Sequence, residues 1–343
     1  MSNFPTQYHF LYGQPQGTAL IRSCNEDFQV VEQLGFEPEG EGEHLFLYVR
    51  KSGENTDWVA RQLAKFCQIS PRDVGYAGKK DRHAVTEQWF SVALPERRVL
   101  NWNLFGGDSI KVLKTVRHPR KLRLGALRGN RFGIRLRDVS DVEELARRIE
   151  LIKAGVPNYF GEQRFGQDGG NLQKGLELIR GERKERQRSK KGMYISAVRS
   201  WCFNHVLSER IGQAQWDEVL EGDALMLAGS KSCFVAEAPL DEVKTRLQQG
   251  EVNLTGPMWG RGESLNVQAS REWEHAQLAP WHEVLERLEH LGLRQERRAL
   301  RLLPVGLEAC EESERQWWLE FELPSGAFAT SVLRELTQVM TPE

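Results

Sequence analysis

The chain has 343 residues, which fits two domains, and its 40% hydrophobic and 28% charged residues exclude wholesale disorder. No apolar run is long enough to cross a bilayer, and a formal net charge of −1 gives no sign of a nucleic-acid partner. Five single cysteines, and an N-terminus without a basic segment before an apolar stretch, lead us to expect reduced thiols and a cytoplasmic protein.

The first third of the chain predicts alternating strands and helices. Two β-rich segments, 28–32 and 44–49, precede a helix with one apolar face over about 56–69. Residues 88–94 and 131–137 then alternate between apolar and polar side chains, which indicates two more strands. The last of these has one apolar and one basic face, so it can rest on a core and present its charges to a ligand.

The later elements begin with a predicted capping box at 140–143, in which Ser140 caps a helix that ends at Gly155. Three segments with helical patterns follow: 196–211, 240–247 and 281–302. Strand character returns at 317–323, and a turn then leads into a short helix that ends near Val339. This order predicts a β-rich domain that is interrupted by a helical insertion.

Basic residues are concentrated in two segments of this nearly neutral chain. Between Ser109 and Arg137 there is no acid, while ten Lys or Arg side chains occur, and a second basic stretch covers 180–191. Such segregation can create a local positive field that attracts phosphates. The alternative is that acids from other segments neutralise these side chains.

Asp81 is the strongest candidate for chemistry. It lies in a glycine-bounded turn between two strand-like stretches, with Lys79, Lys80, Arg82 and His83 as sequence neighbours. Nearby cations are expected to keep its carboxylate ionised at neutral pH. An ionised carboxylate in a cationic loop suits a nucleophile or an electrostatic stabiliser better than a general acid. A polar hairpin tip is the structural alternative.

Several other chemistries find no support in the sequence. The glycine spacing before Asp81 is wrong for a phosphate-binding P-loop, and no dinucleotide fingerprint follows a strand. The eight histidines and five cysteines form no metal-binding pattern, so we expect no metal.

The segment Tyr76 to Asp81 resembles the catalytic signature of the TruD family of tRNA pseudouridine synthases. Four further segments resemble that family in order along the chain: 27–32, 129–132, 157–166, and 324–330 continuing to Arg334 and Glu335. A chance similarity could arise at one loop, but not at five in register.

The resemblance implies an α+β fold with two domains. The catalytic pseudouridine synthase domain, a mixed sheet flanked by helices, is expected at residues 1–155 and 305–343. A helix-rich α/β TRUD domain is expected as an insertion at 156–304, where the composition of the chain changes.

The resemblance also assigns site residues, with Asp81 as the catalytic aspartate. Three residues correspond to the lining of the uridine pocket: Phe28, Asn130 and Phe328. Phe132 fills the place where many other synthase families carry tyrosine. Arg22 is a weaker candidate for the cationic partner of the carboxylate, because its surroundings match the family less well.

The implied activity is isomerisation of uridine to pseudouridine in tRNA, with position 13 as the expected target. Nothing is oxidised, hydrolysed or transferred from a donor, so we expect no cofactor and no bound nucleotide. We expect a monomer that contacts the RNA backbone through these basic residues: Lys79, Lys80, Arg120, Lys121 and Arg123. The alternatives are a non-catalytic RNA-binding protein and a glycosylase that releases free uracil.

Overall fold

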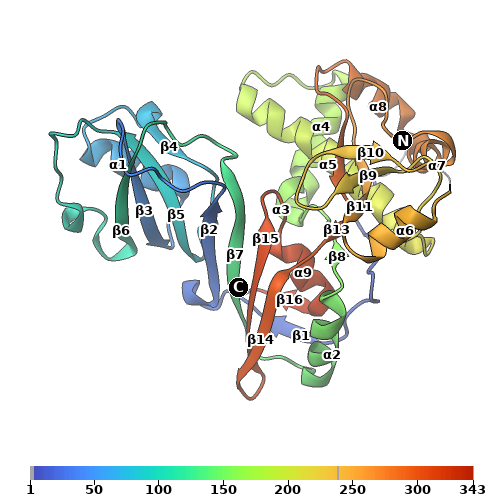
Figure 1. The fold of residues 1–343 in the computed structure, drawn as a ribbon, viewed down its shortest axis with the longest axis horizontal. Helices are drawn as coiled ribbons and strands as arrows, with labels where there is room; N and C mark the ends of the chain where they lie inside the picture. The colour runs from blue at the N-terminus through green and yellow to red at the C-terminus, as the bar shows by residue number, and fades with distance from the viewer. Residues whose placement is uncertain (1–3, 238, 343) are drawn as a thin grey trace. The chain divides into compact units, whose positions relative to one another are not determined.

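The computed structural model describes residues 4–237 and 239–342, which divide into two units (Figure 1). The sheet unit comprises residues 15–153, 304–329 and 336–342. The middle unit comprises residues 4–14, 154–303 and 330–335. Strands and helices occur in both, so the predicted α+β class is confirmed. None of the described helices is both long and apolar enough to span a membrane.

The sheet unit contains one large mixed sheet. Its strands are β2 (Phe28–Leu34), β3 (His44–Ser52), β4 (Val74–Tyr76), β5 (Val85–Ala93), β6 (Ile110–His118), β7 (Leu127–Leu136), β14 (Val305–Ser313) and β15 (Gln316–Pro324). Their order is β14-β15-β7-β2-β5-β3-β6, with β4 added beside β5. Strands β2 and β5 run parallel, and the other neighbours run antiparallel. The four strands predicted in the first part of the chain are confirmed as β2, β3, β5 and β7.

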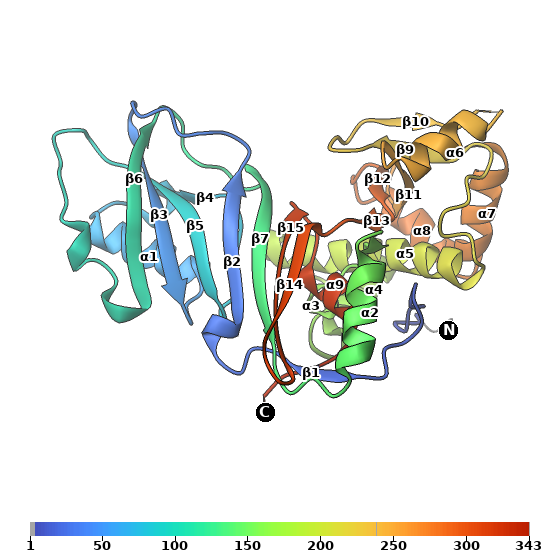
Figure 2. The ribbon, with the colours of Figure 1, turned by 60° about the horizontal axis from the view of Figure 1, so that its bottom comes forward.

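Helix α1 (Thr56–Phe66) covers one face of this sheet (Figure 1, Figure 2). Its apolar stripe includes Val59 and Leu63, which are buried against Leu47, Val49 and Phe90 of the strands. The predicted helix is therefore confirmed. The N-terminal end of α1 contacts β5 through polar side chains, because the hydroxyl of Thr56 donates to the side-chain oxygen of Gln88 (2.9 Å).

Helix α2 (Val142–Ile152) begins one residue later than the predicted capping box required. Its cap is Asp141, whose carboxylate accepts the N–H of Glu144 (2.8 Å). The hydroxyl of Ser140 instead accepts the N–H of Thr18 (2.7 Å), at the start of β1 (Thr18–Leu20). The prediction that Ser140 caps the helix is wrong, because this hydroxyl is committed to a strand that is distant in sequence. Strand β1 pairs in parallel with β16 (Gln338–Met340).

The middle unit packs helices around a smaller sheet. Its helices are α3 (Glu162–Phe165), α4 (Gly170–Arg180), α5 (Arg188–Gly212), α6 (Asp241–Gln248), α7 (Gln268–Leu278) and α8 (His282–Glu289). Its strands are β8 (Val156–Pro157), β9 (Ala224–Leu227), β10 (Cys233–Val235), β11 (Val252–Met258), β12 (Glu296–Ala299) and β13 (Arg301–Leu302). The long helix α5 is buried along most of its length, as expected for a central element.

The predicted helix over 281–302 is wrong in its second half. Helix α8 ends at Glu289, and β12 then pairs antiparallel with β11, with Thr255 opposite Ala299. A partner strand more than 30 residues earlier in the chain determines this strand, so the local helical pattern is overridden.

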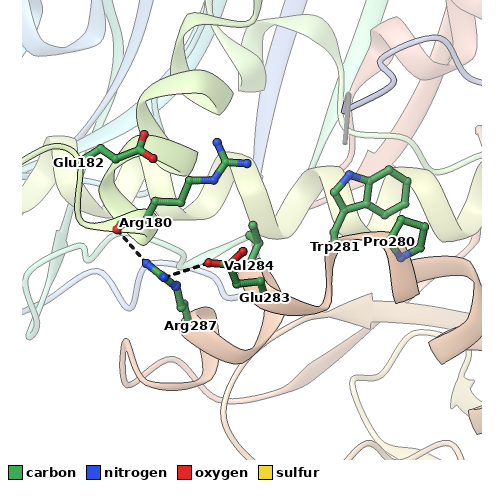
Figure 3. Close-up of a pocket in the computed structure, with 7 residues that line it drawn as sticks. All are labelled: Arg180, Glu182, Pro280, Trp281, Glu283, Val284 and Arg287. Atoms are coloured by element: carbon green, nitrogen blue, oxygen red, sulfur yellow. Dashed lines mark hydrogen bonds and ion pairs between the residues drawn. The ribbon is translucent and has the colours of Figure 1, made fainter. Parts of the chain in front are cut away.

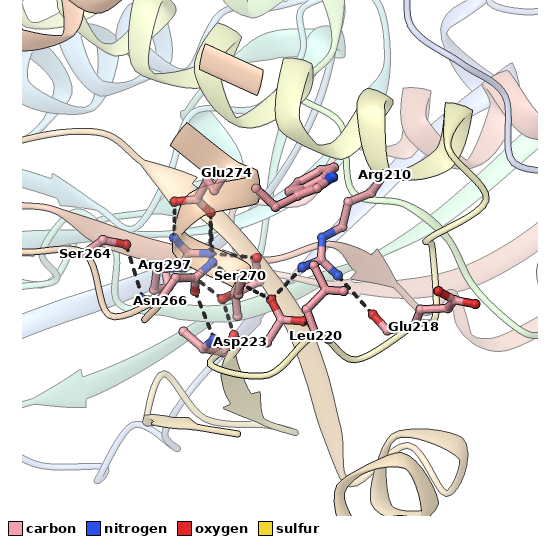
Figure 4. A network of polar contacts seen from close by, with 12 residues as sticks. Arg210, Glu218, Leu220, Asp223, Ser264, Asn266, Ser270, Glu274 and Arg297 are labelled. Atoms are coloured by element: carbon pink, nitrogen blue, oxygen red, sulfur yellow. Dashed lines mark hydrogen bonds and ion pairs between the residues drawn. The ribbon is translucent and has the colours of Figure 1, made fainter. Parts of the chain in front are cut away.

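A buried network of charges joins α5, α7 and the small sheet (Figure 4). Arg210 binds Asp223 (2.5 Å), and Arg297 binds Glu274 (2.8 Å). The side chains of Ser270 and Asn266 link the two ion pairs: Ser270 donates to Asp223, and Asn266 donates to Ser270 and Glu274. Because every charge in it is paired, the network satisfies the requirement for burying ions.

Residues 4–14 and 330–335 belong to the middle unit, whereas the predicted division placed them with the rest of the two chain ends in the other domain. The N–H groups of Leu11 and Tyr12 donate to the carboxylate of Glu335, and the Tyr12 hydroxyl donates to the carbonyl of Gly155 (2.7 Å). These contacts hold residues 4–14 and part of α9 (Ala329–Leu336) in the middle unit. That one part is the catalytic domain and the other an inserted domain stays a prediction.

Candidate active site

Asp81 lies in the loop between β4 and β5, at the end of the sheet face that α1 covers. Its carboxylate oxygen is 3.3 Å from a guanidinium nitrogen of Arg22, and its side chain is 34% exposed. The carboxylate therefore has a cationic partner and still faces solvent, so a substrate can reach it.

Arg22 reaches this carboxylate from a strained backbone. Its φ is 59°, in the left-handed region that residues other than glycine rarely adopt. Backbone hydrogen bonds on its N-terminal side, including one from Ile21 to Met340 (2.9 Å), hold the segment. The guanidinium carbon lies 4.2 Å from the ring centroid of Phe28, within the range of a cation–π contact. Two predicted site residues thus fix each other beside Asp81.

The backbone of the Asp81 loop is held by side chains from α1, β3 and β5. Three bonds do this: Lys51 donates to the carbonyl of Asp81 (2.9 Å), Lys80 donates its N–H to Thr56 (3.0 Å), and Gln88 donates to the carbonyl of Gly78 (3.0 Å). Because the holding groups belong to rigid elements, the position of the carboxylate is determined before any substrate arrives.

Lys80 is buried in an ion pair. Its ammonium lies 2.6 Å from Glu32, and the two side chains are 4% and 0% exposed. The second oxygen of Glu32 accepts the N–H of Trp89 (3.0 Å). An ammonium enclosed in this way cannot reach a phosphate, which argues against the predicted contact of Lys80 with the RNA backbone. Its neighbour Lys79 is 66% exposed and pairs with Asp57.

Lys51 is wholly buried beneath Asp81, and burial lowers the pKa of its ammonium from 10.5 to about 8, although the Asp81 carboxylate partly offsets this. Between these two values the unfolded chain binds more protons at Lys51 than the folded chain. The contribution of Lys51 to the free energy of unfolding therefore rises with pH between these two pKa values and is constant below them.

We predict that the free energy of unfolding of the wild type, relative to Lys51→Met, increases by up to about 3 kcal/mol from pH 8 to pH 10.5. Urea unfolding at several pH values measures the difference. The exposed Lys65→Met variant, on α1, should show no such trend. A difference between wild type and Lys51→Met that stays flat with pH would contradict the assignment.

The aromatic residues that were predicted for the pocket continue from Phe28 across the sheet. Phe28 and Phe132 meet edge to face with their centroids 6.3 Å apart, and Phe132 stacks on Phe321. Asn130 lies two residues from Phe132 on the same face of β7, opposite Glu32 in the register. The structure thus brings Asp81, Arg22, Phe28 and Phe132 together through direct contacts, with Asn130 next to them.

Phe328 lies in the turn between β15 and α9 and is partly buried. It follows Leu323, the strand partner of Asn130, by five residues. The side-chain oxygen of Asn130 is buried, and no described residue donates a hydrogen bond to it. A buried acceptor without a donor costs about 1–3 kcal/mol, so a ligand that donates to it would be favoured.

Three predicted RNA contacts, Arg120, Lys121 and Arg123, lie on the loop between β6 and β7. The loop packs against the Asp81 segment, since the N–H of Gly125 donates to the carbonyl of Ala77 (2.8 Å). Arg120 and Arg123 are exposed and form no ion pair with the described residues, whereas Lys121 donates to the carbonyl of Arg72.

The end of the acid-free stretch has a different role. Arg135 and Arg137 both bind the buried carboxylate of Asp27, and Arg135 also binds Glu312 (2.6 Å). Burial alone would raise the pKa of Asp27, but hydrogen bonds from Arg137 and Arg135 outweigh it and lower that pKa to about 2. Acids from other segments therefore neutralise these two arginines, which is the alternative that the sequence left open.

The sequence did not predict four residues that support the Asp81 loop: Lys51, Glu32, Thr56 and Gln88. Glu32 and Lys51 could have been found, because they occupy core-facing positions on strands whose other core-facing residues are apolar. A charge at such a position signals a buried partner or a functional site. Their partners in the Asp81 loop could not be identified without the fold.

The pocket in Figure 3 lies in the middle unit and offers different chemistry. It has a volume of about 310 Å³ and is lined by residues that include Arg180, Glu283 and Arg287. Arg287 donates both to Glu283 (2.9 Å) and to the carbonyl of Arg180 (2.7 Å), so its charge is already engaged. Among the described residues no group of three or more His, Cys, Asp or Glu is arranged to hold a metal ion.

Comparison with known proteins places this chain in a family. The profile of tRNA pseudouridine synthase D (TruD) matches residues 6–188 and 185–336. A tRNA pseudouridine synthase D of Shewanella oneidensis is 48% identical over 332 residues, which cover 96% of this chain and 89% of the relative. One from Aeromonas salmonicida is 46% identical and covers 97% of this chain and 94% of its own length.

A solved structure from Methanosarcina mazei that bears the same family name shares the fold. Its TM-score is 0.70 over 98% of this chain and 96% of that chain, at 22% sequence identity. The profile match and the near full-length relatives lead to one conclusion. The chain belongs to the TruD family of tRNA pseudouridine synthases.

Proposed function

We propose that this protein isomerises uridine to pseudouridine in tRNA and that Asp81 is its catalytic carboxylate. The observation that carries the proposal is the pairing of Asp81 with Arg22 on a loop that three side chains hold in place. The reaction breaks the bond between C1′ and N1, forms one between C1′ and C5, and releases the C5 hydrogen as a proton while N1 gains one. A carboxylate can start it at the ribose or at the base ring.

The freed uracil must rotate without escaping, which requires a closed pocket. We assign its walls to Phe28, Phe132 and Phe328. The unpaired oxygen of Asn130 would accept a hydrogen bond from a uracil N–H. Arg22 would hold the carboxylate in position through their ion pair.

We assign the RNA backbone contacts to cations near the loop, namely the exposed Lys79, Arg120 and Arg123 and the partly exposed Lys121. Lys80 is left out because its charge is buried against Glu32. Position 13 of tRNA is the proposed target. We further propose a monomer that works in the cytoplasm, and the five free cysteines are compatible with a reducing compartment.

We predict that replacing Arg120, Lys121 and Arg123 together by Glu lowers tRNA affinity and flattens its dependence on salt. Each phosphate that is no longer neutralised should reduce the slope of log affinity against log salt by about 1. Filter binding at several salt concentrations measures this slope. Arg137→Gln serves as the control, because it should lower stability and leave the slope unchanged.

The decisive test of the activity separates it from the two alternatives. Purified protein is incubated with tRNA that carries tritium at C5 and carbon-14 in the uracil ring. An isomerase releases tritium to water and leaves the carbon label in RNA. A glycosylase releases labelled uracil, and a non-catalytic RNA-binding protein releases neither; either of these results would refute the proposal.

A further inference from the structure

The loop between β6 and β7 presents one exposed leucine at the apex of a rigid turn. The N–H of Ala126 donates to the carbonyl of Arg123 (3.2 Å), and Gly125 has a φ of +86°. A glycine with positive φ at the third position is what a type II turn requires. Leu124 therefore occupies the second position of the turn, and it is 72% exposed.

The turn is fastened on both sides of its apex, to β5 on one side and to the segment that precedes Asp81 on the other. Before the apex, Leu122 is buried and its N–H donates to Ser91 (3.0 Å). After the apex, the N–H of Gly125 donates to the carbonyl of Ala77, four residues before Asp81. The approach is so close that a Cβ on Gly75 would lie 2.3 Å from the carbonyl oxygen of Leu122. The apex is thus held in a fixed position beside the proposed catalytic loop.

An exposed leucine alone is ordinary. Leu124 has cationic surroundings beside the proposed catalytic loop, because Arg120 and Arg123 flank it, are exposed and form no ion pair with the described residues. The apex therefore combines an apolar tip with free positive charge. This combination matches nucleic acid, in which apolar side chains enter between bases while cations bind the adjacent phosphates.

We propose that Leu124 is a positioning residue that enters the RNA base stack where the target uridine leaves it, with Arg120 and Arg123 on the flanking phosphates. The inference rests on the proposed function, since a base within folded RNA must be extruded before it can react. Extrusion costs a few kcal/mol, and an apolar side chain that fills the gap offsets part of this cost.

The test compares substrates whose target base is stacked or already free. Leu124→Ala should slow pseudouridine formation about tenfold on folded tRNA and have little effect on a short unstructured RNA. Leu124→Met should restore most of the rate. The control is Leu104→Ala, because Leu104 is 75% exposed on the same unit and should leave both rates unchanged. Equal slowing on both RNAs, or no slowing on tRNA, would overturn the proposal.

A second measurement does not depend on turnover. With 2-aminopurine next to the target uridine, binding of Asp81→Asn should raise the fluorescence of the tRNA, because the stack opens. The double variant Asp81→Asn with Leu124→Ala should bind with a much smaller rise, and an equal rise would overturn the proposal. Failure of the wild type to form pseudouridine in any RNA would instead refute the proposed function.

Discussion

Asp81→Asn should abolish pseudouridine formation while tRNA binding persists. The substitution keeps the size of the side chain and removes its negative charge, so the group that we propose attacks the substrate is lost. We expect single-turnover rates to fall on the order of 10³-fold or more, as for removal of other catalytic nucleophiles. The hydrogen bond from Lys51 is made to the backbone carbonyl of Asp81 and should survive, so the fold should be retained.

The matched control for this variant is Asp73→Asn. Asp73 is an exposed aspartate just before β4, and the same chemical change there should leave the rate intact. Thermal unfolding and filter binding show whether each variant folds and binds tRNA. Substantial turnover by Asp81→Asn would remove this residue from the mechanism.

Breaking the buried pair of Glu32 and Lys80 should have the second largest effect. Glu32→Gln keeps an acceptor for the N–H of Trp89 but leaves the ammonium of Lys80 buried without a charged partner. Removing one member of such a pair costs about 3–5 kcal/mol of stability. Because Lys80 adjoins Asp81, we also expect turnover to fall.

Two further variants separate the cost of an unpaired buried charge from that of a missing ion pair. Adding Lys80→Met to Glu32→Gln removes the unpaired charge and should recover much of the stability, as measured by urea unfolding. The pair of Lys153 and Glu150 has the same 2.6 Å distance but is exposed, so Glu150→Gln should cost less than about 1 kcal/mol. Equal losses of stability from Glu32→Gln and Glu150→Gln would contradict the importance of burial.

The elements that the sequence predicted well are those whose pattern is local. Strand β7 buries the apolar side chains at every second position from Phe132 to Leu136, and α1 carries an apolar stripe, so each is visible within about ten residues. Strand β6 lies at the edge of the sheet and is exposed on both faces over much of its length, which leaves no alternation to detect. Strand β12 depends on its distant partner β11 and was predicted as helix.

The residues of the candidate site also fall into two groups, those with a local signal in the sequence and those that become neighbours only on folding. Asp81 stood out because glycine and a run of cations surround it in the sequence, and the resemblance to the family added Arg22 and Phe28. The supports of the loop were missed because Lys51 and Thr56 become its neighbours only when α1 and β3 fold together. The buried ion pair of Lys80 was missed for a related reason, since a lysine next to Asp81 looks accessible until Glu32 is found beside it.

The central claim, that this chain forms pseudouridine in tRNA through Asp81, is tested most directly by mapping pseudouridine in cellular tRNA. Cells that lack the protein are supplied with the wild type or with Asp81→Asn, and pseudouridine is located at single-nucleotide resolution. We predict that it appears at position 13 with the wild type and is missing with Asp81→Asn. Pseudouridine restored equally by both proteins, or by neither, would contradict the account.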